Sequence, residues 1–271
     1  MFTCPRIWNR ETGMSDFSEC EVKITTRTLM TLLEGCDTKK WQIGFEVGKN
    51  GYRHYQGRFI CSRDDTFDYI GTLLPCMRLE KGEVWCNYES KTGYYISSED
   101  FTETRKTRFG IPNDTQKKIL KEVKRQTVRE VDVWYDPKGN TGKSWLCNWA
   151  YETHQAWYIP PTLKSVQAII QDCASKMQEE RRPMIIIDIP RSWKWTDELY
   201  TAIETIKDGL IDDPRYSSTC INIRGVKVLV LTNYKAKVNA LSIDRWVFNG
   251  KYASDGKTRN ERKRDAYGDR F

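Results

Sequence analysis

The segment 131–144 constrains the fold of this chain more than any other. It begins with the apolar run VDVWY (131–135), continues with the glycine-containing stretch DPKGNTGKS (136–144), and passes into a sequence expected to be helical. A strand, a glycine loop and a helix in this order form a phosphate-binding unit, because backbone N–H groups and the helix N-terminus together bind phosphate oxygens. This segment therefore predicts a phosphate group as its ligand. Strands expected at 131–135, 184–189 and 226–232 alternate with helices expected from 143, around 163–177 and at 197–206. This alternation predicts a parallel α/β sheet.

The residues of the loop have separate expected roles. Lys143 would reach the β- and γ-phosphates of a nucleotide, and the Ser144 hydroxyl would ligate Mg²⁺. The loop departs from the strict GxxxxGK[ST] pattern, because Pro137 occupies its first position. The residues expected to hold the phosphates are Gly139, Asn140, Thr141, Gly142, Lys143 and Ser144.

Length and composition narrow the class of protein. The chain has 271 residues, and a domain has roughly 150, so two domains are expected. The excess of Lys and Arg over Asp and Glu is 44 − 37 = +7, which mildly favours a polyanionic partner. No apolar stretch is long enough for a membrane span, and Arg6 and Arg10 interrupt the place of a signal peptide. Nine cysteines without a CxxC pair indicate reduced thiols in an intracellular protein.

The first half of the chain predicts a β-hairpin. Trp41–Val47 alternates apolar and polar residues, GKNG (48–51) supplies a turn, and Tyr52–Cys61 returns as a second strand. A strand at Phe2–Ile7 and a helix at Thr26–Leu33 are expected beside it. This half is therefore expected to be a sheet with attached helices.

The hairpin brings three polar side chains within reach of one another. His54 and Gln56 are two residues apart and share a face. Glu46 lies on the polar face of its own strand, beside Arg53 or His54 depending on one residue of register. A carboxylate, an imidazole and an amide oxygen suit Mg²⁺ or Mn²⁺ bound together with a substrate phosphate. The alternative is the ordinary polar face of an exposed hairpin.

The segment YESK (88–91) contains a candidate nucleophile. Tyr88 and Lys91 are three residues apart, and on a helix they lie on the same face. A tyrosine hydroxyl needs activation by a metal-polarised phosphate, a base or a nearby cation. A lysine one turn away can stabilise phenolate or developing phosphate charge. A YxxK pair alone is weak evidence, and its position after the hairpin makes it informative.

Together these motifs resemble those of the replication initiator proteins of small circular single-stranded DNA viruses, and their spacing is most similar to the smacovirus branch. The similarity rests on FTCP (2–5), GFE (44–46), HYQG (54–57) and YxxK (88–91). The stretch GNTGKS (139–144) resembles the loop of superfamily 3 helicases. The resemblance implies an α+β HUH-type endonuclease domain, with an antiparallel sheet and helices, followed by an α/β P-loop superfamily 3 helicase domain.

For the first domain, the resemblance implies rolling-circle initiation by nicking and rejoining single-stranded DNA at an origin hairpin. Tyr88 would attack phosphorus and form a 5′-phosphotyrosine, and Lys91 would assist. Glu46, His54 and Gln56 would hold the Mg²⁺ or Mn²⁺. Plasmid and transposon relatives have a second histidine where this chain has Gln56, so a weaker or differently selective metal site is expected. Tyr94 and Tyr95 follow closely, and either could be a decoy or an auxiliary nucleophile.

For the second domain, the resemblance implies ATP with Mg²⁺ as cofactor. The run MIIID (184–188) resembles a Walker B strand in which Asp188 would hold Mg²⁺ through water, but Ile189 stands where a second acid usually follows. Asn233 resembles a sensor residue at the γ-phosphate, and Arg245 resembles an arginine finger for a neighbouring subunit. Their alternatives are a strand-end cap for Asp188, a turn former for Asn233 and a surface ion pair for Arg245.

The expected organisation is an endonuclease domain at 1–105, a linker or oligomerisation segment at 106–129, and an ATPase/helicase domain at 130–271. The last twenty residues are rich in charge and predict a mobile tail. The resemblance implies a hexameric ring of identical subunits, single-stranded DNA and the host replication machinery as partners, and no membrane. It places the protein in the host nucleus in a eukaryote and in the host cytoplasm otherwise.

Two other functions remain open. A plasmid or mobile-element initiator of the same type would have both sites. A non-catalytic, nucleotide-switched nucleic-acid-binding protein would use the loop as a switch and the hairpin as a binding face. The missing acid after Asp188 keeps this second alternative open.

Overall fold

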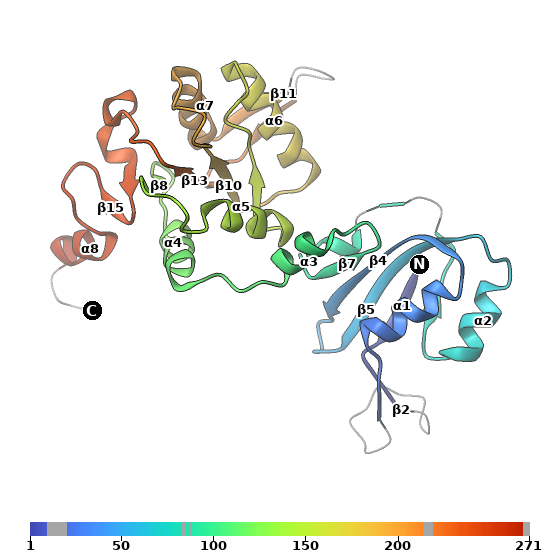
Figure 1. Ribbon diagram of the computed structural model, residues 1–271. Helices are drawn as coiled ribbons and strands as arrows, with labels where there is room; N and C mark the ends of the chain where they lie inside the picture. The colour runs from blue at the N-terminus through green and yellow to red at the C-terminus, as the bar shows by residue number, and fades with distance from the viewer. Residues whose placement is uncertain (10–20, 83–84, 87, 214–218, 268–271) are drawn as a thin grey trace. The chain divides into compact units, whose positions relative to one another are not determined.

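The computed structural model describes the chain except for residues 10–20, 83–84, 87, 214–218 and 268–271. The chain divides into two compact units, Met1–Phe109 and Gly110–Phe271, and each is described by itself (Figure 1). In the described part of the chain, no helix is long and apolar enough to cross a membrane.

The first unit is built on a five-stranded antiparallel sheet in the order β6-β1-β5-β4-β7. Its strands are β1 (Phe2–Pro5), β4 (Thr38–Val47), β5 (Arg53–Cys61), β6 (Arg78–Leu79) and β7 (Tyr95–Ser97). β4 and β5 form the predicted hairpin, and the Gly51 N–H donates a hydrogen bond to the Gly48 carbonyl across its turn. The alternation of apolar and polar residues gives the sheet one apolar and one polar face.

Two helices contribute to the core of the first unit. Helix α1 (Thr26–Glu34) begins with a capping box between Thr25 and Thr28 and presents Leu29 and Leu33 to the sheet. Helix α2 (Thr66–Leu73) contributes Ile70 to the same core. The remaining elements are β2 (Ile7–Asn9), β3 (Glu21–Lys23), the 3₁₀ turn η1 (Tyr88–Ser90) and α3 (Thr102–Arg108).

The second unit has a six-stranded sheet in the order β15-β14-β8-β13-β10-β9, in which only β15 runs antiparallel to its neighbour. Its strands are β8 (Val131–Tyr135), β9 (Ala156–Tyr158), β10 (Met184–Asp188), β13 (Lys227–Thr232), β14 (Trp246–Phe248) and β15 (Lys251–Tyr252). The parallel pairing follows from the alternation of strands and helices along the chain. The strands predicted at 131–135, 184–189 and 226–232 are confirmed.

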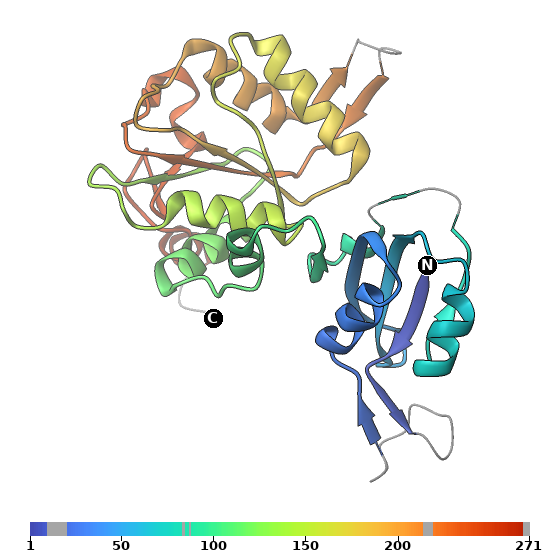
Figure 2. The same cartoon turned by 45° about the vertical axis from the view of Figure 1, so that its right-hand side comes forward.

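Helices pack on both faces of this sheet (Figure 2). Val131 and Val133 of β8 lie in the core with α6 and α7, whereas Trp134 lies in the opposite core with α4 and α5. The helices are α4 (Asp114–Lys124), α5 (Lys143–Glu152), α6 (Val166–Glu179), α7 (Asp197–Asp208) and α8 (Arg259–Tyr267). A ribbon of β11 (Leu210–Asp213) and β12 (Thr219–Asn222) and the turns η2 (Val238–Ala240) and η3 (Ile243–Arg245) complete the unit.

The segment 106–129, expected as a linker, is not separate in the structure. The boundary between the units falls after Phe109, and α4 packs Leu120 and Val123 into the core beside β8. The apolar residues of this segment are widely spaced, but on a helix they form one stripe that faces the core. Residues 110–129 therefore belong to the second unit.

The last twenty residues also differ from expectation, because they are not a free tail throughout. They include α8, and Arg259 at its start is only 7% exposed. Its guanidinium donates to the carboxylates of Glu130 and Asp132. A charged segment is expected to be exposed to solvent, because charged side chains are buried only when they are paired. The partners of Arg259 lie far away in the chain, so the sequence of the tail did not indicate its burial.

Candidate functional site

The polar face of the β4–β5 hairpin brings together the three predicted metal ligands. The register pairs Glu46 with His54, not with Arg53, and it pairs Gly44 with Gln56. His54 Nε2 lies 3.9 Å from Glu46 Oε2. Gln56 follows on the same face, and its Oε1 accepts a hydrogen bond from Thr3 Oγ1 at 2.8 Å.

The donor atoms of this cluster fit a hard divalent cation. His54 Nδ1 lies 3.3 Å from the Tyr52 carbonyl, and a donor at Nδ1 leaves the lone pair on Nε2, the nitrogen beside Glu46. Glu46 Oε1 is buried, and the Lys91 ammonium lies close to it. In the part of the chain that the structure describes, no three His, Cys, Asp or Glu side chains converge on a metal position. A metal here would therefore need the Gln56 amide as its third protein ligand.

Tyr88 and Lys91 lie at the edge of this cluster. Tyr88 begins the 3₁₀ turn η1 (Tyr88–Ser90), and Lys91 follows directly after it. Lys91 Nζ lies 3.1 Å from Glu46 Oε1 and 3.5 Å from the centroid of the Tyr88 ring, and Tyr88 is 54% exposed. Burial lowers the pKa of Lys91, but its contacts with Tyr88 and Glu46 outweigh this and raise it overall. Lys91 is therefore an ammonium at neutral pH and contacts both the tyrosine and the carboxylate.

Two contacts hold the turn of Tyr88 against the sheet. A Cβ at Gly44 would lie 2.1 Å from the Glu89 carbonyl oxygen, so the close approach of η1 to β4 requires glycine. The Glu89 side chain is fully buried, and its Oε1 accepts a hydrogen bond from Arg58 Nε at 3.2 Å. The motifs did not identify Arg58 or Glu89. Arg58 follows His54 and Gln56 at the spacing of one strand face, which is the signal that could have found it.

The two further tyrosines are placed differently. Tyr95 lies in β7 with the Arg108 guanidinium 3.7 Å from its ring centroid. Tyr94 precedes β7 and is 58% exposed. In the described part of the chain, Tyr88 is the tyrosine whose ring Lys91 contacts.

In the second unit, the loop after β8 is organised by Asp136. The backbone of Gly139, Asn140 and Gly142 has positive φ angles of 78°, 62° and 84°. Asp136 accepts hydrogen bonds from the Gly139 N–H, Thr141 Oγ1 and Lys143 Nζ at 2.9, 2.7 and 3.0 Å. Burial raises the pKa of Asp136, but the bonds from Thr141, Gly139 and Lys143 outweigh it and lower this pKa to about 2. The loop is therefore held by an ionised carboxylate from its own first residue.

This loop borders a cavity of about 350 Å³. The predicted residues that line it are Gly139, Asn140, Gly142, Lys143, Ser144, Asp188 and Asn233. Since β8, β13 and β10 are adjacent parallel strands, the segments that follow their carboxyl ends meet at one edge of the sheet. Asn233 Nδ2 donates to the Asp136 carbonyl at 2.6 Å. Burial raises the pKa of Asp188. A hydrogen bond with Ser144 and the charge of Lys143 act in the opposite direction, but the pKa remains raised overall.

The cavity contains a single acid. Asp188 is the one carboxylate among the described residues that line it, and Ile189 after it is 1% exposed. A hydrolytic site normally has a second acid to polarise water, and the lining residues do not provide one. The donor set fits a nucleotide phosphate with Mg²⁺, while the catalytic base is missing from this cavity.

Arg245 does not fit the predicted role of an arginine finger. Its side chain is buried, with Nη2 3.1 Å from Asp208 Oδ1 and 3.4 Å from Glu204 Oε1 of α7. Trp246, the next residue, pairs with Val131 at the start of β8, so Arg245 lies at the opposite edge of the sheet from the loop. An arginine finger must be exposed to reach a neighbouring subunit. Arg245 is instead buried and paired with acids of its own subunit.

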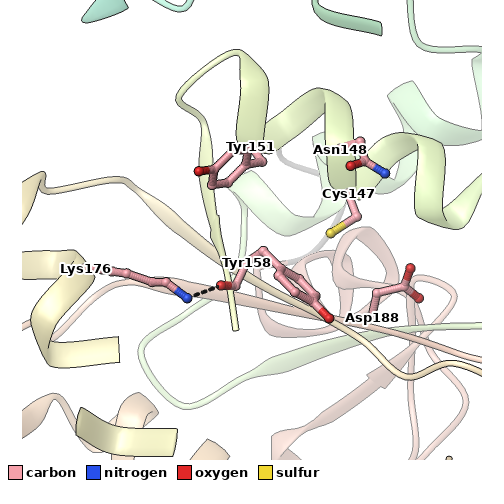
Figure 3. Close-up of a pocket in the computed structure, with 6 residues that line it drawn as sticks. All are labelled: Cys147, Asn148, Tyr151, Tyr158, Lys176 and Asp188. Atoms are coloured by element: carbon pink, nitrogen blue, oxygen red, sulfur yellow. Dashed lines mark hydrogen bonds between the residues drawn. The ribbon is translucent and has the colours of Figure 1, made fainter. Parts of the chain in front are cut away.

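A second cavity of about 420 Å³ also borders Asp188 (Figure 3). Figure 3 shows the Tyr158 ring directed toward Asp188, with the Cys147 sulfur close by. Lys176 Nζ donates to the Tyr158 carbonyl at 2.8 Å and pairs with Asp172. Burial, together with the charge of Asp188, raises the pKa of the Cys147 thiol to about 12, so it is protonated at neutral pH. This recess therefore provides no activated thiol.

Comparison with known proteins does not place the chain in a family. No protein-family model matches it, and no curated protein matches it either. The function is therefore inferred from the motifs and the geometry of the two sites.

Proposed function

We propose that this protein is a rolling-circle replication initiator that nicks and rejoins single-stranded DNA through Tyr88. The single observation that carries the proposal is the convergence of Tyr88, Lys91, Glu46 and His54 on the polar face of one hairpin. An exposed tyrosine beside an ammonium and a ligand set for a divalent cation is suited to attack on a phosphodiester. A mere binding face would not require these groups to meet.

The residues have distinct roles in this chemistry. The Tyr88 hydroxyl gives up its proton to solvent and its oxygen attacks phosphorus. The bond from phosphorus to the DNA 3′ oxygen breaks, that oxygen takes up a proton to become a 3′ hydroxyl, and the 5′ phosphate becomes linked to Tyr88. Lys91 carries a raised pKa, so it acts as a cation that stabilises phenolate and developing phosphate charge and does not accept the phenol proton. Glu46, His54 and Gln56 would hold a divalent cation, which supplies polarisation of the scissile phosphate when bound. Rejoining is the reverse attack by a 3′ hydroxyl on the phosphotyrosine.

The experiment that tests the proposal is a nicking assay on a library of single-stranded hairpins with Mn²⁺ or Mg²⁺. A covalent adduct between the protein and the 5′ end of the cleaved strand is the expected result. If no hairpin yields an adduct with either metal, the endonuclease function is rejected.

We expect chelation of divalent cations to abolish adduct formation. His54→Ala should raise the Mn²⁺ concentration for half-maximal activity by at least about 10-fold. Removing a residue that only supports a metal ligand already lowers metal affinity by about 10-fold or more, and removing the ligand itself should lower it at least as much. The measurement is adduct yield during a Mn²⁺ titration after treatment with EDTA.

Arg53→Ala is the matched control for this titration. Arg53 is an exposed neighbour in β5 whose side chain lies on the other face of the strand. It should leave the Mn²⁺ requirement unchanged. Full activity in excess EDTA would contradict the metal-dependent mechanism.

For the second unit, we propose that the loop 136–144 binds ATP and that hydrolysis drives DNA unwinding in an oligomeric ring. Lys143 and Ser144 would hold the phosphates and Mg²⁺ from the start of α5, with Asp188 and Asn233 facing them. A larger open cavity beside the loop shares Asn140, Gly142 and Trp145 with the first and leaves space for the nucleoside.

Lys143→Ala is expected to lower kcat/KM for ATP hydrolysis by about 100-fold or more, because it removes the cation aimed at the β- and γ-phosphates. Asp136 keeps two other hydrogen bonds in this variant, so the loop should remain folded. Lys138→Ala, an exposed lysine of the same loop, is the control and should retain activity. Equal hydrolysis by both variants would contradict a phosphate-binding role for Lys143.

The single acid in the cavity favours a second candidate, a nucleotide-switched nucleic-acid-binding protein. Such a protein would bind ATP through Lys143 without turning it over. Wild-type protein that binds ATP but neither hydrolyses it nor forms a DNA adduct would support this candidate over the initiator.

A further inference from the structure

Arg191 lies over the phosphate-binding loop, and none of the sequence motifs assigned it a function. It follows Asp188 by three residues and lines the same cavity. Its Nη2 donates to the Lys138 carbonyl at 2.7 Å. A Cβ built on Gly139 would lie 1.8 Å from the same nitrogen, so the guanidinium packs directly against the glycine backbone.

The backbone of Arg191 is held from the neighbouring strand. The Tyr234 hydroxyl donates to the Arg191 carbonyl at 2.7 Å, and Tyr234 comes directly after Asn233 at the end of β13. In turn, Trp195 Nε1 donates to the Tyr234 carbonyl at 3.2 Å. The position of Arg191 is therefore coupled to the same strand ends that place Asn233 and Asp188.

The charge of Arg191 is not used inside the protein. In the described part of the chain, Arg191 forms no ion pair, although it contributes a guanidinium to the cavity. By contrast, Lys143 is paired with Asp136, and Arg245 is paired with Asp208. A nucleoside triphosphate carries several negative charges, and Arg191 is the cation of this cavity whose charge is still uncompensated.

We propose that Arg191 binds the terminal phosphate of a nucleoside triphosphate in this cavity, an inference that rests on the proposed nucleotide-binding function. Lys143 and Ser144 place the β- and γ-phosphates at the start of α5. Arg191, Asp188 and Asn233 come from the strand ends that face this point, which is the γ-phosphate end of the nucleotide. The planar guanidinium can donate two parallel hydrogen bonds to phosphate oxygens. The chain thus supplies from within one subunit the cation that Arg245 does not.

The test compares ATP and ADP binding by the full chain in the presence of Mg²⁺, using fluorescent analogues of both nucleotides. Arg191→Ala should weaken ATP binding by about 10- to 100-fold, the range for loss of a hydrogen bond to a charged group. It should weaken ADP binding by less than about 3-fold, because ADP lacks the terminal phosphate. Arg191→Lys should restore part of the preference for ATP, since it keeps the charge but loses the paired donors.

Lys194→Ala is the matched control, because Lys194 is an exposed cation three residues away that does not line the cavity. It should bind both nucleotides like the wild type. If Arg191→Ala weakens ATP and ADP equally, Arg191 only holds the loop through Lys138 and the proposal is overturned. If ATP binding is unchanged, the proposal also fails while nucleotide binding stands. Wild-type protein that binds neither nucleotide would overturn nucleotide binding itself, together with this inference.

Discussion

Tyr88→Phe is expected to lower covalent adduct formation by at least about 10³-fold, because it removes the attacking oxygen and leaves no substitute on the same side chain. The phenylalanine ring keeps its packing and its contact with the Lys91 ammonium, which lies 3.5 Å from the ring centroid. Half of the Tyr88 side chain is exposed, so removing the hydroxyl creates no buried cavity. DNA binding, measured by fluorescence anisotropy on an uncleavable hairpin, should therefore remain close to wild type.

Tyr94→Phe is the matched control for this experiment. Tyr94 is as exposed as Tyr88 and only six residues away, but its ring does not contact Lys91 in the described part of the chain. Adduct formation should persist in Tyr94→Phe. If the adduct instead survives Tyr88→Phe and disappears in Tyr94→Phe or Tyr95→Phe, the nucleophile has been assigned to the wrong residue.

Arg259→Ala is expected to lower the free energy of unfolding of the second unit by about 3–5 kcal/mol, because it leaves buried carboxylates without a partner. The Arg259 guanidinium donates through two nitrogens to Asp132 of β8, at 3.1 and 2.9 Å, and through Nε to Glu130 at 3.0 Å. Glu130 is also bonded to the Tyr252 hydroxyl. The contact therefore joins the start of α8 to the strand that carries the phosphate loop.

This loss of stability should also depend on pH. Burial already raises the pKa of Asp132, and Arg259 opposes that rise, so removing Arg259 should raise it further. When the pKa of a carboxyl group is higher in the folded than in the unfolded state, the free energy of unfolding of the protein falls as pH rises through these pKa values. The deficit of Arg259→Ala should thus shrink in acid and grow toward neutral pH.

Urea unfolding of the full chain measures this effect through tryptophan fluorescence, since seven of the ten tryptophans follow Gly110. Arg129→Ala is the control, because Arg129 also pairs with an aspartate, Asp244, but both side chains are about half exposed. It should cost less than about 1 kcal/mol, as exposed ion pairs do. Equal stability of Arg259→Ala and wild type would show that the buried network does not support the fold.

The local elements near the two sites could be predicted because apolar periodicity is present residue by residue in the chain. The hairpin at 41–61 and the strands before the loop and at Asp188 occur where their patterns place them. The tail could not be predicted in this way. Arg259 in this tail is buried against partners that lie 127 and 129 residues away in the chain. The charged sequence of the tail does not indicate which distant residues these are.

The candidate sites show the same division. Their residue types were apparent from the motifs, but the choice of His54 over Arg53 as the partner of Glu46 depended on the register of the turn. Spacing along the strand could have placed Arg58 on the face of His54 and Gln56. It could not reveal the buried partner of Arg58, because Glu89 lies thirty-one positions away in a turn.

The amino-acid sequence alone determined which chemical groups this protein can use: a tyrosine with a lysine, a carboxylate–imidazole–amide set, and a glycine loop with lysine and serine. The tertiary structure decided which cations are available to a ligand. It buries Arg245 against two acids of α7 and leaves Arg191 in the lining of the cavity. The physical reason is that a cation without an acidic partner in the fold keeps its full charge for a ligand to neutralise, and such partners come from elements that are distant in the chain.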